Sequence, residues 1–276
     1  MKKLLIGLSL PLSLSLSLSL SLSLSLLATP SWAAVKGKPV TYQANGVTLN
    51  GYLAADDAAK GKRPGVLVVH EWWGHNEHAR ERARRLAKLG YVALAVDMFG
   101  EGKQAQHPDE AKKFATAVGG DPETARARFN AALDFLKKQK NVDPEHIAAI
   151  GFCFGGTIVL QMARAGLDLD GVVSFHGGLA TQTPAEPGKV HSKVLVLTGA
   201  DDKMIPPEQV AQFEEEMKTA GVDYRVVVYP SAKHAFTNPA ADGYAKKFNM
   251  PVGYDAKADK ASWEEMRKFL KEVFAK

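Results

Sequence analysis

The sequence predicts an α/β fold in which a mostly parallel central sheet carries helices on both faces. Short apolar runs alternate along the chain with stretches of helical periodicity, as is typical of parallel strands joined by helical crossovers. The runs are apolar throughout, as expected for strands buried on both faces. An antiparallel hairpin is expected ahead of this pattern, because 40–54 contains two strand signals around Asn45-Gly46, a strong hairpin dipeptide.

Each element has its own signal in the chain. After the hairpin, apolar runs predict strands over 66–69, 91–96, 146–150, 171–175, 193–198 and 224–229. Helices are expected over 76–89, about 109–118, 122–139, from the glycine-rich turn to about 165, 207–220, near 239–248 and 260–275. Gly90 and Gly221 follow two of these helices, as glycine commonly does at a helix C-terminus. Asp121 and Pro122 indicate a helix start, the first as a cap and the second in the first turn.

The N-terminus has the composition of a signal peptide. Two lysines precede an apolar run of Ser-Leu repeats, and Ser31 and Ala33 are small residues at the positions that signal peptidase requires. We therefore expect a signal peptide over 1–33, cleaved after Ala33, and a single α/β domain over 34–276. The protein would be exported, either to the periplasm or out of the cell. Because the apolar run is slightly longer than usual, an uncleaved N-terminal anchor is the alternative.

The composition excludes several classes of partner. The formal net charge is +5, and basic residues are mixed with acidic ones along helices such as 76–89, without a basic stripe interleaved with aromatics. This pattern is typical of solvated helix faces, so no nucleic-acid partner is expected. No other apolar run approaches the length of a membrane span. We expect no membrane contact beyond the signal segment, no cofactor and no metal; the oligomeric state stays open, with a monomer favoured.

Cys153 is the only cysteine of the chain and lies in the motif Gly-Phe-Cys-Phe-Gly-Gly after an apolar run. It cannot form an internal disulfide, so the thiol is either a buried hydrophobic group or a group kept for chemistry. Gly151 and Gly155 flank it where a sharp strand-to-helix turn crowds any larger side chain. Such a turn brings the thiol near a helix N-terminus, which favours the thiolate. The backbone N–H of Phe154 would be free to stabilise an oxyanion.

An acid and a base follow Cys153 at the places that a hydrolase needs. Side chains after the carboxyl ends of parallel strands meet at one edge of the sheet. Asp202 follows the strand at 193–198, and His234 follows the strand at 224–229. The chain order of nucleophile, acid and base matches that of hydrolases with the same turn. We therefore predict that these three residues form a catalytic triad.

Six segments of the chain resemble the dienelactone hydrolase family, whose members have the α/β-hydrolase fold and a cysteine nucleophile. The segments are VVHEWWG, VDMFGEG, HPDEA, GFCFGG, GADDKMIPPE and YPSAKHAF. The resemblance implies a carboxylic ester hydrolase that cleaves a small-molecule ester or lactone through a thioester acyl-enzyme. It implies that Cys153 is the nucleophile, His234 the base and Asp202 the acid, because the family's pattern G-x-x-D-x-x-hydrophobic-P begins at Gly199. A role for Asp201, one position earlier, is left open.

The resemblance also implies roles for residues around the triad. The family places a glutamate, here Glu71, beside the nucleophile in the resting site, where it shares the thiol's proton until substrate displaces it. Trp72 would supply a second oxyanion N–H beside that of Phe154. Five further side chains are expected to line the substrate pocket: Trp73, Phe99, His176, Phe236 and Asn238.

Two positions depart from the family's pattern. Members that bind the carboxylate of dienelactone use an arginine four residues after the base and another in the loop after the strand of the VDMFG segment. Here the first position is Asn238, and Lys103 is the only cation around the second. An arginine binds a carboxylate through two charge-assisted hydrogen bonds, which asparagine cannot replace. We therefore do not expect 4-carboxymethylenebutenolide to be the natural substrate.

Two other functions are left open as alternatives. His70, His75 and His78 are candidates for a metal-dependent hydrolase, although the stretch HEWWGHNEH has Gly74 where the H-E-x-x-H motif needs its second histidine. The other alternative is a catalytically silent binding protein with a hydrolase fold, for which a broken triad would be expected.

Overall fold

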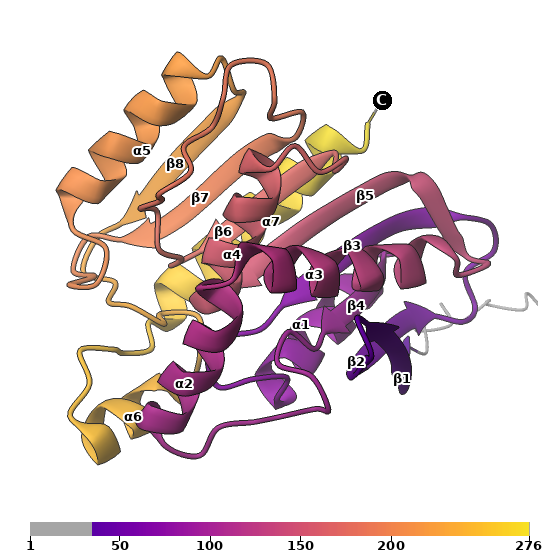
Figure 1. Ribbon diagram of the computed structural model, residues 1–276, viewed down its shortest axis with the longest axis horizontal. Coiled ribbons are helices and arrows are strands. Elements are labelled where there is room, and N and C mark those ends of the chain that lie inside the picture. Colours follow the sequence, from indigo (N-terminus) through magenta and orange to yellow (C-terminus); the bar gives the residue numbers. More distant parts are fainter. Residues whose placement is uncertain (1–34, 276) are drawn as a thin grey trace, which may run out of the picture. The chain divides into compact units, whose positions relative to one another are not determined.

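The computed structural model describes residues 35–275. The predicted signal peptide over 1–33 lies outside the described residues. Within them, an eight-stranded sheet has the order β1-β2-β4-β3-β5-β6-β7-β8 (Figure 1). β1 pairs with β2, and β2 with β4, in antiparallel fashion, whereas all later neighbours are parallel. The α/β fold, the mostly parallel sheet and the N-terminal hairpin are confirmed.

The strands are β1 Val35–Ala44, β2 Val47–Asp56, β3 Arg63–Val69, β4 Val92–Val96, β5 Val142–Phe152, β6 Gly171–Phe175, β7 Lys193–Gly199 and β8 Tyr224–Tyr229. The helices are α1 Glu77–Lys88, α2 Pro108–Gly119, α3 Pro122–Lys137, α4 Phe154–Arg164, α5 Pro207–Thr219, α6 Ala241–Phe248 and α7 Ala256–Val273. Every predicted strand and helix has a counterpart within a few residues.

Four elements begin three or more residues earlier than predicted: β1 at Val35, β3 at Arg63, β5 at Val142 and α7 at Ala256. The last two have a local reason. β5 starts at Val142, because its first residues pair with β3 ahead of a register shift between Pro64 and Gly65. α7 starts at Ala256, because the side chain of Asp255 accepts the backbone N–H groups of Lys257 and Ala258 and so caps the helix. Neither the shift nor this cap is marked by a change in hydrophobic periodicity.

Alternate residues of the central strands pack into two separate hydrophobic cores, one on each face of the sheet. Leu67 and Val69 of β3 join a cluster with residues of α3, α4 and α5, whereas Val66 and Val68 join a cluster with residues of α1 and α7. The sheet is thus covered on both faces, as predicted (Figure 1). Among residues 35–275, no helix combines the length and apolar character that crossing a bilayer requires.

Helices α2 and α6 form a third packing unit. Ala111 and Phe114 of α2 gather with Tyr244 and Phe248 of α6 around Trp73, which follows β3. Trp73 stacks on Tyr244 with ring centroids 4.2 Å apart. The two helices therefore flank the segment after the carboxyl end of β3. The carboxyl ends of the other parallel strands meet at the same edge, where the candidate site lies.

Candidate active site

Cys153 occupies the turn between β5 and α4 in a conformation that few residues adopt. Its φ of 52° and ψ of −115° lie outside the common regions, and such conformations cluster at functional sites. The flanking glycines are required by close backbone contacts. A Cβ on Gly151 would lie 2.1 Å from the carbonyl oxygen of Gly155, and a Cβ on Gly155 would lie 2.3 Å from that of Val69. The expected reason for both glycines is confirmed.

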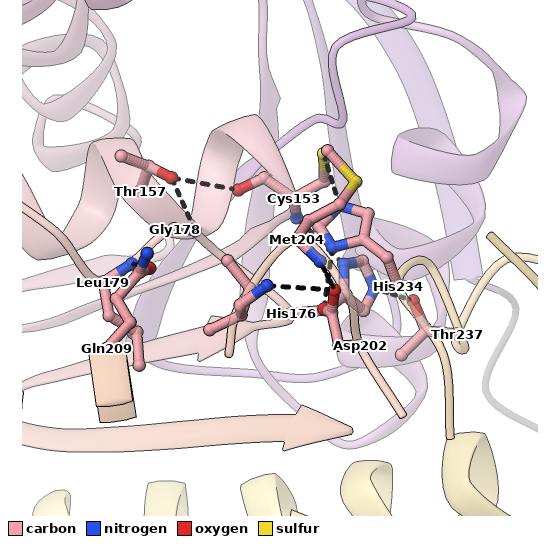
Figure 2. A network of polar contacts seen from close by, with 11 residues as sticks. Cys153, Thr157, His176, Gly178, Leu179, Asp202, Met204, Gln209, His234 and Thr237 are labelled. Carbon is pink, nitrogen blue, oxygen red and sulfur yellow. Dashed lines mark hydrogen bonds and ion pairs between the residues drawn. The ribbon is translucent and has the colours of Figure 1, made fainter. Parts of the chain in front are cut away.

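His234 lies between Cys153 and Asp202 (Figure 2). Its Nε2 is 3.1 Å from the Cys153 Sγ, and its Nδ1 is 2.8 Å from Oδ2 of Asp202. The other carboxylate oxygen, Oδ1, accepts backbone N–H groups from Met204 at 2.8 Å and Ile205 at 3.2 Å. The structure thus brings together the three predicted residues in the order of a triad. The carboxylate is fixed on both sides and in turn fixes the imidazole.

Asp201 lies outside this row of hydrogen bonds. Its side chain is exposed, and its backbone N–H donates to the carbonyl of Ala232. That bond links the loop after β7 to the loop after β8. The contact involves the backbone alone, so the family's counting and the geometry both select Asp202 as the partner of His234.

The charges around His234 favour its protonated form. Burial by itself would lower the pKa of the imidazole, but attraction to the Cys153 sulfur and hydrogen bonds with Asp202 and Cys153 outweigh it and raise the pKa to about 10. At neutral pH this balance favours the imidazolium form of His234 beside the Cys153 sulfur.

Two backbone amides are free to bind an oxyanion. Within residues 35–275, neither Trp72 nor Phe154 donates its N–H to a protein acceptor. Phe154 is the first residue of α4, so its N–H has no acceptor within the helix and carries the partial positive charge of the helix N-terminus. The Cys153 N–H is already engaged, because it donates to the carbonyl of Phe175. Both N–H groups therefore lack a protein acceptor, as the predicted oxyanion role requires.

Glu71 is almost fully buried beside the thiol, but its polar partner differs from the expected one. Its Oε2 accepts a hydrogen bond from Nδ2 of Asn238, and its Oε1 has no partner among the described residues. Burial raises the pKa of this carboxyl to about 7, although the Asn238 amide and the charges of His234 and Arg82 oppose the shift. The Cys153 sulfur is hydrogen-bonded to His234, and among the described residues no hydrogen bond joins it to the Glu71 carboxyl.

A small pocket of about 50 Å³ lies beside the sulfur. It is lined by Glu71, Trp72, Trp73, Cys153, Met204, His234, Ala235, Tyr244, Met250 and Val252. The lining is mostly apolar and contains no lysine or arginine. Met204 is 46% exposed, whereas the other lining residues are buried or half-buried, so Met204 forms the rim of the pocket.

Of the five predicted pocket side chains, Trp73 alone lines this pocket. Phe99 instead packs against His70, Phe114 and Phe154. Phe236 and His176 are fully buried behind the catalytic row, the hydrogen-bonded residues Cys153, His234 and Asp202, and the rings of Phe236 and His176 pack against each other. These three side chains do not line this pocket, because position after a strand end does not reveal which way a ring packs.

Asn238 does not line this pocket either, and several residues that do line it were not predicted. Asn238 borders a larger neighbouring hollow, and its amide reaches the pocket only by holding Glu71. The missed walls, Tyr244, Met250 and Val252, come from α6 and from the segment that returns to pair with His234. No motif in the sequence marks this return.

Two of the three candidate metal histidines face other groups, whereas neither ring nitrogen of the buried His75 has a hydrogen-bond partner among the described residues. His70 donates from Nδ1 to the carbonyl of Glu71 and accepts the N–H of Met98 at Nε2. His78 accepts from the guanidinium of Arg82, a cation that would repel a metal. Among the residues that the structure describes, no group of three or more His, Cys, Asp or Glu side chains is arranged to hold a metal ion.

Comparison with known proteins agrees with this geometry. The model of the dienelactone hydrolase family matches residues 49–274. "Protein usf" of Aquifex pyrophilus is 34% identical over 207 residues, 73% of this chain and 87% of its own length. A protein of Aquifex aeolicus with a provisional name as a carboxymethylenebutenolidase is 30% identical over 241 residues, covering 85% of this chain and 98% of its own.

A solved structure of a dienelactone hydrolase-like protein is also similar to this chain. The crystal structure of a dienelactone hydrolase-like promiscuous phosphotriesterase from metagenomic libraries superposes with a TM-score of 0.82 and 38% sequence identity. The superposition covers 87% of this chain and 98% of the other chain.

Proposed function

The chain belongs to the dienelactone hydrolase family and is an ester hydrolase, and from this premise we propose that it cleaves uncharged carboxylic esters or lactones with Cys153 as nucleophile. The observation that carries the proposal is the position of His234, within hydrogen-bond distance of both the Cys153 sulfur and the Asp202 carboxylate. The intact row argues against a silent binding protein with the same fold.

The reaction follows from the position of each group. The thiolate attacks the carbonyl carbon, and the negative charge that develops on the oxygen is stabilised by the N–H groups of Trp72 and Phe154. The imidazolium of His234 gives its proton to the leaving alkoxide as the carbon–oxygen bond breaks, which leaves a thioester on Cys153. His234 then takes a proton from water as the hydroxide attacks the thioester carbon; the carbon–sulfur bond breaks, the carboxylic acid leaves, and the thiolate and imidazolium of the starting state are restored. Asp202 holds the imidazole in position throughout.

The charges at the pocket support an uncharged substrate. Glu71 is the one carboxylate among the described lining residues, and no lysine or arginine lines the pocket to balance it. The imidazolium of His234 is already paired with Cys153 and Asp202. Lys103 is exposed and pairs with Glu101 at 2.9 Å. A substrate carboxylate placed here would be repelled by Glu71 once that group is ionised, and repulsion at short range in a partly buried site is on the order of a few kcal/mol.

A matched pair of lactones tests this substrate class. On the purified protein at pH 8, we expect kcat/KM for an uncharged lactone to exceed that for the same lactone with a carboxylate by at least about tenfold. The Asn238→Arg variant should narrow this gap, because arginine would pair with Glu71 and attract the anion. Lys103→Gln is the matched control and should leave the ratio unchanged. A preference of the natural protein for the anionic lactone would contradict the proposal, and so would inactivity toward all esters and lactones.

Export is part of the proposal. The basic start, the apolar run and the small residues before position 34 support cleavage after Ala33 and release to the periplasm or medium. N-terminal sequencing of the protein recovered outside the cytoplasm should begin at Ala34. An intact N-terminus in the membrane fraction would indicate the uncleaved anchor instead.

A further inference from the structure

His176 lies behind the catalytic row, at the end of β6, and its ring is completely buried (Figure 2). The proposed reaction assigns this ring no step. We propose that His176 is a positioning residue that joins the backbone of Cys153 to the loop carrying His234 and so keeps the sulfur and the base at reacting distance. The inference rests on the proposed function, which gives Cys153 and His234 the reacting atoms.

Both nitrogens of the His176 ring are engaged. Nδ1 lies 3.2 Å from the backbone nitrogen of Cys153, and Nε2 lies 2.8 Å from Oγ1 of Thr237. A backbone N–H can only donate, so Nδ1 must accept and the ring hydrogen must be on Nε2, where it donates to Thr237. The two contacts therefore fix one tautomer of a neutral imidazole.

The surroundings keep this ring neutral. Burial, together with the nearby charges of His234, His78 and Arg82, holds the pKa of His176 well below its usual range. The ring lies edge-on to His234 with centroids 5.3 Å apart. A neutral His176 can accept the Cys153 N–H while its neighbour His234 carries a proton, and a protonated one could not.

Thr237, the far partner of this ring, is anchored from two helices. Its carbonyl accepts a short hydrogen bond from the guanidinium of Arg82 in α1. Arg82 pairs with Asp259 of α7 at 3.0 Å, and both side chains are almost fully buried. Thr237 follows His234 by three residues. The loop that carries the base is therefore fixed to α1 and α7, and His176 connects this anchor to the nucleophile turn.

The nucleophile turn needs such a connection because its backbone is strained. The Cys153 N–H is shared between the carbonyl of Phe175 at 3.0 Å and Nδ1 of His176. Loss of the ring acceptor would let the turn relax from its unusual φ and ψ and would move the sulfur relative to Nε2 of His234. Small displacements of reacting groups cost about 10²-fold in rate when the geometry is tight.

Three substitutions test the proposal. His176→Phe keeps a ring but removes the acceptor, and it should lower kcat for p-nitrophenyl acetate by about 10²-fold with little change in KM. It should also shift the pH profile of Cys153 alkylation by iodoacetamide to higher pH, because the imidazolium–thiolate pair forms less readily. His176→Asn places an amide oxygen near the position of Nδ1 and should recover most of both losses. Thr237→Val should give an intermediate effect.

Phe236→Leu is the matched control. It removes packing against the same ring, with centroids 5.1 Å apart, and leaves both hydrogen bonds intact, so kcat and the alkylation profile should stay close to those of the natural protein. The proposal would be overturned if His176→Phe had the same kcat and the same pH profile of Cys153 alkylation as the natural protein. It would also be overturned if His176→Asn folded but had a kcat as low as that of His176→Phe. If His176→Phe does not fold, His176→Asn and Thr237→Val carry the test. Alkylation does not require hydrolysis, so this result is separate from failure of the proposed function.

Discussion

Replacing Cys153 with alanine will lower the rate of p-nitrophenyl acetate hydrolysis by about 10⁴-fold or more, because no other group in the described pocket can form the acyl-enzyme. The fold should be preserved, since the thiol is half-buried and its polar partner is His234. Hydrolysis should be measured beside circular dichroism and thermal unfolding of the same preparation. Activity near that of the natural protein in this variant would disprove the nucleophile.

Substitutions of the neighbouring residues Asp202 and Asp201 test which of them is the acid of the triad. Asp202→Asn should lose about 10⁴-fold in kcat, because the amide would favour the wrong tautomer of His234. Asp201→Asn is the control, and it should retain most activity since its side chain is exposed and does not reach the imidazole. Equal losses in both variants would contradict the assignment of Asp202.

Replacing Glu71 with glutamine will raise the free energy of unfolding at alkaline pH and will slow the reaction of the Cys153 thiolate with iodoacetamide. The pKa of Glu71 is raised from 4.5 to about 7 in the folded protein by burial. Below pH 4.5 the carboxyl is protonated in both folded and unfolded states, and it has no effect on stability. As pH rises toward 7, the unfolded chain releases this proton first, so stability falls, and above 7 the loss is constant at about 3 kcal/mol.

The glutamine variant avoids this loss and can still accept the Asn238 hydrogen bond through its amide oxygen. Urea unfolding should therefore show a gain of up to about 3 kcal/mol over the natural protein at pH 8 and little gain near pH 4. Alkylation of Cys153 by iodoacetamide should be slower at pH 8, because the variant lacks the negative charge that favours the imidazolium of His234. Glu101→Gln, at an exposed glutamate, should change neither quantity. A pH-independent difference in stability, or an unchanged alkylation rate, would contradict the raised pKa or the electrostatic role.

The residues of the proposed triad could be predicted from the sequence, because each is tied to the backbone pattern. Cys153 needs glycines at fixed distances, and Asp202 and His234 follow apolar strands whose carboxyl ends must meet. Those constraints are local in sequence or follow from the order of parallel strands. The same reasoning predicted all strands and helices to within a few residues.

The side chains that shape the pocket could not be predicted in this way. Met250 and Val252 reach the thiol because the chain turns back after α6, and no periodicity marks that path. Asn238 was expected in the pocket, but it holds Glu71 instead, a contact between residues 167 positions apart. His176 faces inward, where its ring lies between the backbone of Cys153 and the side chain of Thr237. These outcomes depend on three-dimensional packing, which a motif in one chain does not encode.

The proposed triad and the residue that positions it come from four neighbouring strands, since Cys153, His176, Asp202 and His234 follow β5, β6, β7 and β8 in turn. Half of the sheet must therefore be assembled before any of the chemistry exists. Hydrolysis consequently serves as an assay of complete folding. In a library of truncated, split or circularly permuted chains, a coloured ester would identify the members in which β5 to β8 had come together correctly.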